Sequence, residues 1–345
     1  MRTKLINNNT GAAYMLALVT LLVGCVLALA MLRASNTYFL AEDSRCKKQA
    51  EAYLAQAGVE YAYYKVHYQN QPLPFAAQVN MDKGAFKVQA SDDGSRDLST
   101  MLVTSTGKIG ASEVTIKRVT LGLLPYHYGW CENTSISTIN QFVSSGVERG
   151  FRTNGGAGLY ALSNNINTGI WSAGNIVANG SVSPRNTNSP PIAFPNINYS
   201  YYISNAAYYY SYDVFFSGLD RAEDTIIYVN GNTTINTSTN KYRGVLTIVC
   251  TGSITVKSNL IPQNSNSFLA LITTRDIIVE SGAPNITAVL YAHRAIGNSE
   301  IRIQGNTTVV GSVAADDIIN SGRMDVTRDA RLNIDIMRRL KLPGL

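Results

Sequence analysis

Two carboxylates in the C-terminal half have a spacing that could support acid–base catalysis. Four short β-like runs align with one another there: IVCTGSITV, ITTRDIIVE, YAHRAIGNS and VAADDIINS. In this alignment Asp276 and Asp317 occupy the same position of the second and fourth runs, and Ala295 occupies that position of the third. If the runs stack as coils ~4.8 Å apart, the carboxylates lie ~9.6 Å apart, near the upper limit for inverting glycosidases. Any turn position offers this spacing, and Arg275 and Arg294 would pair with both acids at the surface. We therefore predict no catalytic residue and expect that the chain is not an enzyme.

Histidines and cysteines, which carry metal and nucleophilic chemistry, show no ligand spacing. Three histidines are isolated from one another in the sequence: His67, His127 and His293. Cys25 and Cys250 lie in apolar runs and are expected to be packed thiols. Cys46 and Cys131 could pair with each other outside the cytoplasm. Because CxxC, GxSxG, P-loop and HExxH motifs are all missing from the sequence, we predict no metal site and no cofactor.

The composition favours strands and turns over helices. The chain has 345 residues, of which 45% are hydrophobic and only 15% are charged, whereas soluble domains average roughly 25% charged residues. It contains 27 Gly and 20 Tyr, together with many Asn, Thr and Ser residues. This excludes a helical bundle or a Rossmann-type enzyme for most of the chain. The net charge of +6 is scattered along the sequence, so we expect no nucleic-acid partner.

An uncharged apolar run near the N-terminus is long enough to cross a membrane. It extends from Gly11 to Leu32 and would span ~33 Å as a helix, which matches a bilayer core. Arg2 and Lys4 precede it, so the positive-inside rule predicts a cytoplasmic N-terminus and export of the remainder. The alternative is a signal peptide cleaved near Ala30, but the run exceeds the ~7–15 apolar residues usual for such signals.

The same helix is expected to continue beyond the apolar run. Residues 38–66 are rich in Ala, Gln and Glu, and their apolar and aromatic residues recur mainly at helical spacing. Residues 35–37 could soften the helix, and the prolines at 72 and 74 would end it.

This helix resembles the N-terminal segment of type IV pilus assembly proteins of the PilX type. The resemblance covers residues 10–66 and rests on four pieces in order: Gly11-Ala12-Ala13, Arg33-Ala34-Ser35, QAEA at 49–52 and QAGVEYA at 56–62. It implies a helix that anchors the protein in the bacterial inner membrane and then packs on other pilins or pilus assembly proteins. Major pilins carry Glu five residues after the processing glycine, where Leu16 stands here. Cleavage after Gly11 and incorporation into a fibre therefore stay open.

Three alternating runs after the helix predict an antiparallel β meander. They are residues 84–90, 99–105 and 113–121, with turn sequences between them. A meander beside a long helix resembles the head of a pilin.

Beyond residue 128, short apolar runs followed by Asn, Gly or Ser recur about every 20 residues. This period predicts a parallel, right-handed β-helix over 129–345, with a β-sandwich as the alternative fold. A Tyr- and Pro-rich insert at 189–220 breaks the repeat, and Asp329–Leu342 is expected to cap the solenoid. This layout resembles the exported β-helical domain that often follows PilX-type anchors, with a strand at Thr225–Val229 and an ending that carries Val326, Asp329 and Leu332.

The insert contains a cluster of seven tyrosines. Their rings either cover the open side and edge of the coils or bind surface carbohydrate. The tyrosines are Tyr199, Tyr201, Tyr202, Tyr208, Tyr209, Tyr210 and Tyr212.

The fold class is thus mainly β, with a membrane anchor and pilin-like helix (1–70), a meander (71–128) and a β-helix domain (129–345). The function that follows is a non-enzymatic, minor-pilin-like component of a bacterial type IV pilus or related machine. It would sit in the inner membrane as a single-pass protein that displays its β-helix outside. The alternatives are a membrane-tethered adhesin or carbohydrate-binding module unrelated to pili, or a β-helical enzyme acting on polysaccharides.

Overall fold

The computed structural model describes most of the chain and divides it into two compact units. The described residues are 9–67, 69, 71, 73–92, 100–138, 142–144, 150–159, 165–166, 169–183, 185–189, 191–221 and 223–345. The first unit holds the chain up to Val59 with Ala77–Val88 and Thr104–Ile116; the second holds Glu60–Ala76, Gln89–Val103 and Lys117–Leu345. Arg2 and Lys4, on which the expected orientation depends, lie outside the described residues.

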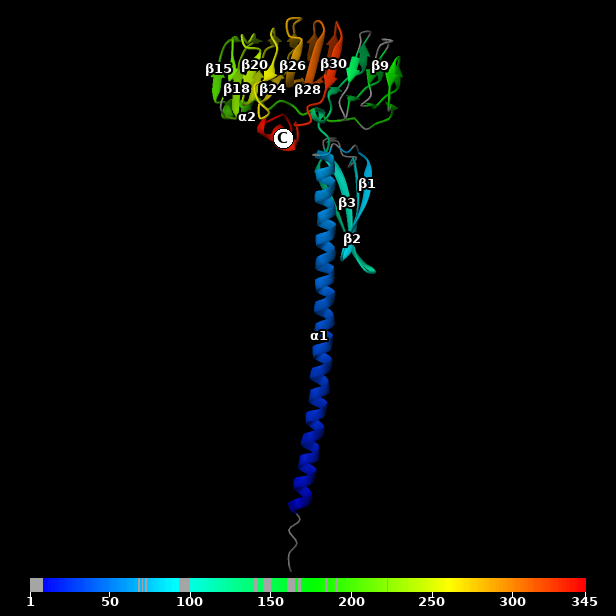
Figure 1. Ribbon diagram of the computed structural model, residues 1–345. Helices are drawn as coiled ribbons and strands as arrows, with labels where there is room; N and C mark the ends of the chain where they lie inside the picture. The colour runs from blue at the N-terminus through cyan, green and yellow to red at the C-terminus, as the bar shows by residue number, and fades with distance from the viewer. Residues whose placement is uncertain are drawn as a thin grey trace, which may run out of the picture. The chain divides into compact units, whose positions relative to one another are not determined.

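The N-terminal segment forms one continuous helix, α1 (Asn9–His67), which confirms the predicted long helix (Figure 1). The predicted soft point does not interrupt the helix, and the Thr37 hydroxyl there donates a hydrogen bond to the Arg33 carbonyl. Thr20 makes the same bond to Leu16. Both hydroxyls are thereby satisfied without leaving the helical path.

The small sheet has four strands in the order β1-β2-β3-β4. They are β1 (Phe75–Met81), β2 (Gly84–Asp92), β3 (Thr100–Ile109) and β4 (Ser112–Leu121). The sheet is antiparallel, as predicted. Strand β1 was not predicted, because its side chains alternate only between half-buried and exposed, and its composition (FAAQVNM) gives little apolar contrast.

The remaining strands stack as the coils of a parallel β-solenoid, which confirms the predicted fold (Figure 1). The short helix η1 (Pro125–His127) leads into it. The first section contains β5 (Trp130–Glu132), β6 (Ile136–Thr138), β7 (Phe142–Ser144), β8 (Phe151–Thr153), β9 (Ala157–Leu159), β10 (Asn165–Ile166), β11 (Ile170–Ser172), β12 (Ile176–Ala178), β13 (Ser181–Val182) and β14 (Arg185–Asn186).

The second section follows helix α2 (Tyr199–Asn205). It contains β15 (Tyr208–Tyr210), β16 (Val214–Phe216), β17 (Leu219–Asp220), β18 (Thr225–Val229), β19 (Thr233–Ile235), β20 (Lys241–Arg243), β21 (Val245–Cys250), β22 (Ile254–Val256), β23 (Ile261–Pro262), β24 (Phe268–Thr273), β25 (Ile277–Val279), β26 (Asn285–Ala292), β27 (Glu300–Ile303), β28 (Thr307–Ala315), β29 (Asp317–Asn320) and β30 (Met324–Thr327). Successive coils pair in parallel, for example β21 with β24 and β26 with β28, which rules out the alternative β-sandwich of hairpins.

The coils are not stacked in chain order. β28 pairs with β5, with Val313 opposite Trp130, and β30 pairs with β7, with Met324 opposite Phe142. The last coil therefore adjoins the first one at an internal seam. The ends of the largest sheet are instead β13 on one side and β15 on the other.

Residues 187–198, here called the crossing segment, connect β14 to α2 and lead the chain from one section of the solenoid to the other (Figure 1). Pro191 and Pro195 suit an extended path without strand pairing. The insert predicted at 189–220 thus combines this crossing, the helix α2 and the strands β15–β17, which form the first coil of the second section.

The C-terminal segment does not cover an end of the solenoid, contrary to the expectation for Asp329–Leu342. It follows β30, which has a strand on each side, and it contains the short helix α3 (Ile334–Arg339). The Thr247 hydroxyl of β21 donates to the Leu340 carbonyl at 2.6 Å. The segment therefore packs on the outer side of the large sheet, the side that faces away from the solenoid core.

The solenoid core is a stack of inward-facing apolar side chains that continues across the seam. One row of register partners in this core runs through both sections: Ile227, Ile248, Leu271, Leu290, Val313, Trp130, Phe151 and Ile170. Every member of this row is fully buried. Burial of such a side chain contributes about 1.5–3 kcal/mol, so the row unites the two sections into one core.

Candidate functional site

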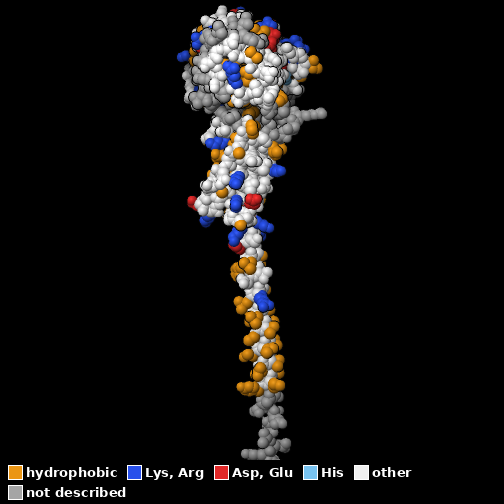
Figure 2. Space-filling model, turned by 90° about the vertical axis from the view of Figure 1, so that its right-hand side faces the viewer, with side chains coloured by type: hydrophobic (Ala, Val, Ile, Leu, Met, Phe, Trp, Pro, Cys, Tyr) orange, Lys and Arg blue, Asp and Glu red, His pale blue; other side chains and the backbone are white. Residues whose placement is uncertain are grey.

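The N-terminal half of α1 exposes a continuous apolar surface. Large apolar side chains from Tyr14 to Leu32 are between 50% and 77% exposed. The helix contains an 18-residue window of mean hydropathy 2.8, none of which is buried within the protein. Figure 2 shows this part of the helix covered largely by orange side chains. The helix is therefore long and apolar enough to cross a membrane, and an apolar surface of this size requires an external partner.

Further along α1, small residues let the meander approach the helix closely. A Cβ atom on Gly107 of β3 would lie 2.1 Å from the Glu51 carbonyl oxygen and 2.6 Å from the Ala55 nitrogen. A Cβ atom on Gly58 would lie 2.0 Å from the Ser105 hydroxyl. These distances are shorter than real Cβ contacts, so both positions must be glycine for strand and helix to meet this way.

A buried carboxylate lies at the same contact. Glu51 is 0% exposed, and its Oε2 accepts a hydrogen bond from the Ser112 hydroxyl at 3.1 Å. Its Oε1 has no hydrogen-bond partner among the described residues. One oxygen of the buried Glu51 carboxylate therefore receives no hydrogen bond from the described residues.

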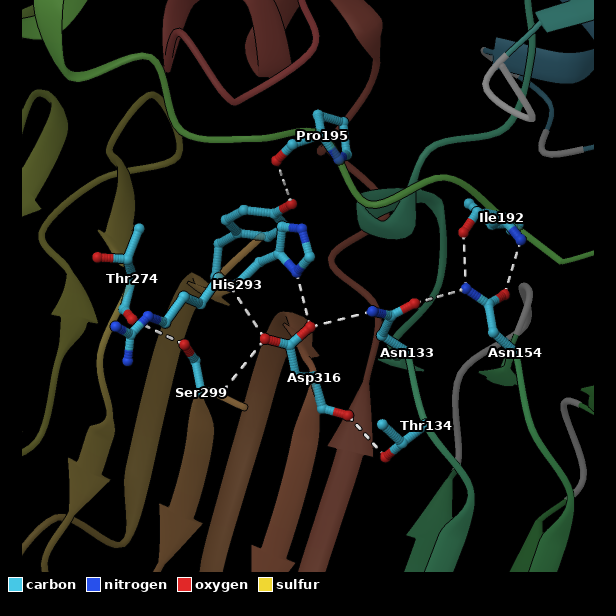
Figure 3. A network of polar contacts seen from close by, with 11 residues as sticks. Asn133, Thr134, Asn154, Ile192, Pro195, Thr274, His293, Ser299 and Asp316 are labelled. Carbon is cyan, nitrogen blue, oxygen red and sulfur yellow. Dashed lines mark hydrogen bonds and ion pairs between the residues drawn. The ribbon is translucent and has the colours of Figure 1, made fainter. Parts of the chain in front are cut away.

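A polar network fastens the solenoid seam (Figure 3). Asp316, at the end of β28, is 2% exposed and accepts hydrogen bonds from the His293 ring at 2.6 Å and the Asn133 amide at 3.1 Å. Its other oxygen accepts from the backbone N–H groups of Arg294 and Ser299. Burial alone would raise the pKa of Asp316, but the bonds from His293, Arg294 and Asn133 outweigh it and lower the pKa.

The network also holds the crossing segment. The Asn154 amide donates to Asn133 at 2.9 Å and to the Ile192 carbonyl at 2.7 Å, and its oxygen accepts from the Ile192 N–H at 2.7 Å (Figure 3). The Tyr291 hydroxyl donates to the Pro195 carbonyl. The same side chains thus join the two sections and fix the chain that connects them.

Asp276 and Asp317 are two coils apart, as the alignment predicted, but the residue between them is Glu300. Ile277, Ile301 and Ile318 are register partners, so the residues that precede them form one row. The alignment of the four runs also matched Ile296 with Ile277 and Ile318. Ile296 is instead 86% exposed and lies outside the strands, because the loop before β27 is longer than the repeat assumed. Ala295 therefore does not lie between the two aspartates.

The partners of these acids also differ from the prediction. Asp276 pairs with Arg302 at 3.6 Å, and Arg302 also contacts Glu300 at 2.6 Å. Asp317 faces the buried Glu132; burial, followed by this carboxyl neighbour, raises the pKa of Glu132 well above its usual range. Asp276, Glu300 and Arg302 are among the residues that line an open groove of about 600 Å³.

The cysteines are free thiols, and one of them differs from expectation. Cys250 is packed as predicted, and burial raises its pKa to about 12. Cys25 is exposed on α1 instead of packed, and Cys46 is exposed as well. Cys131 is buried.

The histidines are less isolated than the sequence suggested. Nδ1 of His67 lies 3.2 Å from Nε2 of His127, and both side chains are buried. His293 contacts Asp316. In the part of the chain that the structure describes, no group of three or more His, Cys, Asp or Glu residues could hold a metal ion.

The tyrosine cluster divides between packing and exposure. Tyr199 donates its hydroxyl to the Cys250 carbonyl at 3.1 Å, and Tyr202 is 2% exposed. Tyr209 stacks on Tyr228 at the edge of the large sheet, with ring centroids 5.5 Å apart, yet it remains 53% exposed. Tyr212 is 65% exposed. Some rings therefore cover the coils, while others leave an aromatic surface at the β15 end.

Comparisons with known proteins match parts of this architecture. Residues 201–334 match a family described as a domain of unknown function, DUF7305. No curated protein matches the chain. The crystal structure of the competence-associated pilin ComZ from Thermus thermophilus aligns with 81% of this chain and 91% of its own chain, at 10% identity and a TM-score of 0.36.

Proposed function

We propose that the chain is a minor-pilin-like component of a bacterial type IV pilus or a related machine. Its N-terminal helix holds it in the inner membrane before assembly and then packs on the helices of neighbouring pilins. Its solenoid is displayed outside. The observation that carries this proposal is the continuity of α1. Its apolar side chains from Tyr14 to Leu32 are exposed, while its second half contributes buried residues such as Ala55 and Val59.

A continuous helix of this kind suits transfer from lipid to a fibre. The exposed apolar side chains can be covered by lipid or by similar helices, and no change in the fold is needed to exchange one for the other. Arg2 and Lys4 support a cytoplasmic N-terminus, which places the meander and the solenoid on the exported side.

Sheared pili from the organism that carries this chain provide the test. We expect the protein in the sheared fraction, and we expect its deletion to abolish piliation or pilus-dependent adhesion, with restoration by the intact gene. Normal pili with normal function in the deletion strain would contradict the proposal. Intact-mass measurement of the mature protein distinguishes cleavage after Gly11, cleavage near Ala30 and no cleavage. Cleavage near Ala30 would remove most of the exposed apolar part of α1 and would also contradict the proposal.

The exposed aromatic edge supports a second candidate, a membrane-tethered adhesin that works without pili. Phe215 of β16 is 60% exposed, close in sequence to the exposed Tyr209 and Tyr212. Adhesion that persists in cells without pili, and that is lost in a Phe215→Ala, Tyr212→Ala double variant, would favour this candidate over the first.

Both candidates are non-enzymatic. Asp276 forms an ion pair and Asp317 faces a carboxyl group, so neither acid has the free partner of a glycosidase pair. Polysaccharide cleavage by the purified protein that is lost in Asp276→Asn and Asp317→Asn variants would contradict this part of the proposal.

A further inference from the structure

Arg152 of β8 is a buried arginine for which the described part of the chain supplies no counter-charge. The residue is 5% exposed, and its Nε has no hydrogen-bond partner among the described residues. Among the described residues, no acidic side chain forms an ion pair with it. Because arginine stays charged at every physiological pH, its burial is unfavourable unless an anion completes the site.

The nearest candidates within the sheet do not neutralise Arg152. Its register partner on β5 is Cys131, whose pKa is raised by burial, so the thiol is neutral. Glu132 follows Cys131 and points to the opposite side of the strand, where its Oε2 accepts a hydrogen bond from the core residue Trp130. No described acidic side chain therefore compensates the positive charge of Arg152 on the outer side of the sheet.

Aromatic rings stand beside this charge. Trp171 is the register partner of Arg152 on the next coil, and Asn186 follows on the coil after that, so the three side chains succeed one another about every 4.8 Å. The Tyr128 ring lies next to both: its centroid is 5.8 Å from the Arg152 Cζ and 6.0 Å from the Trp171 ring centroid.

These residues line a cavity of about 260 Å³ between the sheet and the crossing segment. Thr187 and Asn188 of the crossing segment form part of its wall. Asn188 has a left-handed backbone with φ of 55°, which Asn tolerates in a tight turn. The cavity is slightly smaller than the ~300–1,000 Å³ of sites for drug-sized ligands, so its ligand is about the size of one sugar ring.

We propose that this cavity binds a sugar acid, a hexuronate residue, through Arg152, Trp171 and the asparagines at 186 and 188. The planar guanidinium matches a carboxylate in a two-bond geometry that a lysine cannot form. The Trp171 ring offers an apolar face for the C–H side of the sugar, and the amides of Asn186 and Asn188 offer donors and acceptors for its hydroxyls. This binding site goes beyond the pilin role and does not depend on it.

Titration calorimetry on the full chain in detergent tests the proposal. The probe is methyl glucuronide, compared with methyl glucoside, which lacks the carboxylate, and with acetate, which lacks the sugar. We expect saturable binding of the glucuronide and at least tenfold weaker binding of the other two. A trisaccharide that ends in glucuronate distinguishes the source: tighter binding than the monosaccharide points to a polysaccharide end, and equal binding points to a single sugar acid.

Variants locate the binding in this cavity. Arg152→Met should abolish glucuronide binding, Arg152→Lys should weaken it about tenfold, and Trp171→Phe should weaken it less. Arg185→Gln is the matched control, because Arg185 is a neighbouring exposed arginine outside the cavity, and this variant should bind normally. No saturable binding of glucuronide, equal binding of glucoside or acetate, or unchanged binding by both Arg152→Lys and Trp171→Phe would overturn the proposal, even if Arg152→Met failed to fold.

Discussion

The solenoid buries its apolar side chains within the chain, whereas the N-terminal half of α1 leaves them exposed. In the solenoid each coil covers the next, so residues such as Ile248 and Phe151 are fully buried. In α1 the side chains around Val23 project in all directions from a helix that no other described element covers there. Among the described residues, the solenoid thus covers its apolar core with its own coils, whereas the N-terminal half of α1 carries an apolar surface that no other described element covers.

The largest effect should come from a substitution at the seam of the solenoid. Phe151→Ala should reduce the free energy of unfolding by about 3–5 kcal/mol, because Phe151 stacks on Trp130 in the core row that joins the two sections. Phe215→Ala is the control, since Phe215 is exposed and its loss leaves no cavity. Denaturant unfolding of the full chain in detergent measures both. Equal stability of the two variants would show that the seam is not part of the core.

A charge in the exposed half of α1 should weaken membrane insertion without changing the stability of the solenoid. Val23→Arg should leave the stability of the solenoid unchanged but disfavour membrane insertion by about 2.5–3.5 kcal/mol. The matched control is Val119→Arg, because Val119 is a similarly exposed valine on β4. Membrane fractionation of cells measures the effect. Equal membrane retention of both variants would contradict a membrane role for α1.

A third substitution tests the contact where α1 is covered by its own chain. Gly107→Ala should cost about 1–3 kcal/mol, because the new methyl group would collide with the Glu51 carbonyl. Gly218→Ala is the control, since nothing lies within 4 Å of its Cβ position. Hydrogen exchange of the meander reports the loss. Unchanged protection in Gly107→Ala would mean that strand and helix are not in close contact.

The smallest expected effects concern two carboxyl groups at the seam, Asp316 and Glu132. The stability of the protein should depend on pH in opposite directions through these two groups. The folded pKa of Asp316 lies below its unfolded value, so its contribution is present above about pH 4 and is lost as the pH falls through the folded pKa. The folded pKa of Glu132 is raised, so stability decreases as the pH rises above about 4.3. Asp316→Asn should therefore destabilise the protein at pH 7 by about 1–3 kcal/mol.

Glu132→Gln should stabilise the protein at pH 7, because it replaces an acid whose ionisation the fold disfavours. It should also remove the decrease in stability that is expected as the pH rises above about 4.3. Unfolding curves between pH 3 and 8 check both signs. The same sign for both variants at pH 7 would contradict the assigned pKa directions.

Much of the fold could be predicted from the sequence. The uncharged run after Gly11 and the helical spacing that follows predicted α1. The spacing of Ile254, Ile277, Ile296 and Ile318 predicted stacked coils, although Ile296 lies outside the strands. These features are local, because the alternation of exposed and buried side chains repeats about every 3.6 residues in a helix and about every 2 residues in a β-strand. The strand β1 was missed because its two faces differ too little in polarity.

The functional positions were harder to predict. Glu300, and not Ala295, lies between Asp276 and Asp317, because a loop of irregular length shifted the register by several residues. Arg152 and Trp171 gave no motif, since each is a single residue in an unremarkable strand. Their alignment on neighbouring coils was available from the repeat, but the cavity exists only where the crossing segment passes over them.

The sequence by itself determined the kinds of element: a long apolar helix, a meander and short strands with Asn- and Gly-rich turns. Only the tertiary structure decided the order of the coils, in which β28 meets β5 and the last coil adjoins the first. The physical reason lies in the strands themselves. The edges of parallel coils offer the same backbone hydrogen bonds, so local pattern does not select a neighbour. That choice depends on the side chains of distant residues, such as Val313 against Trp130 and Asp316 against Asn133.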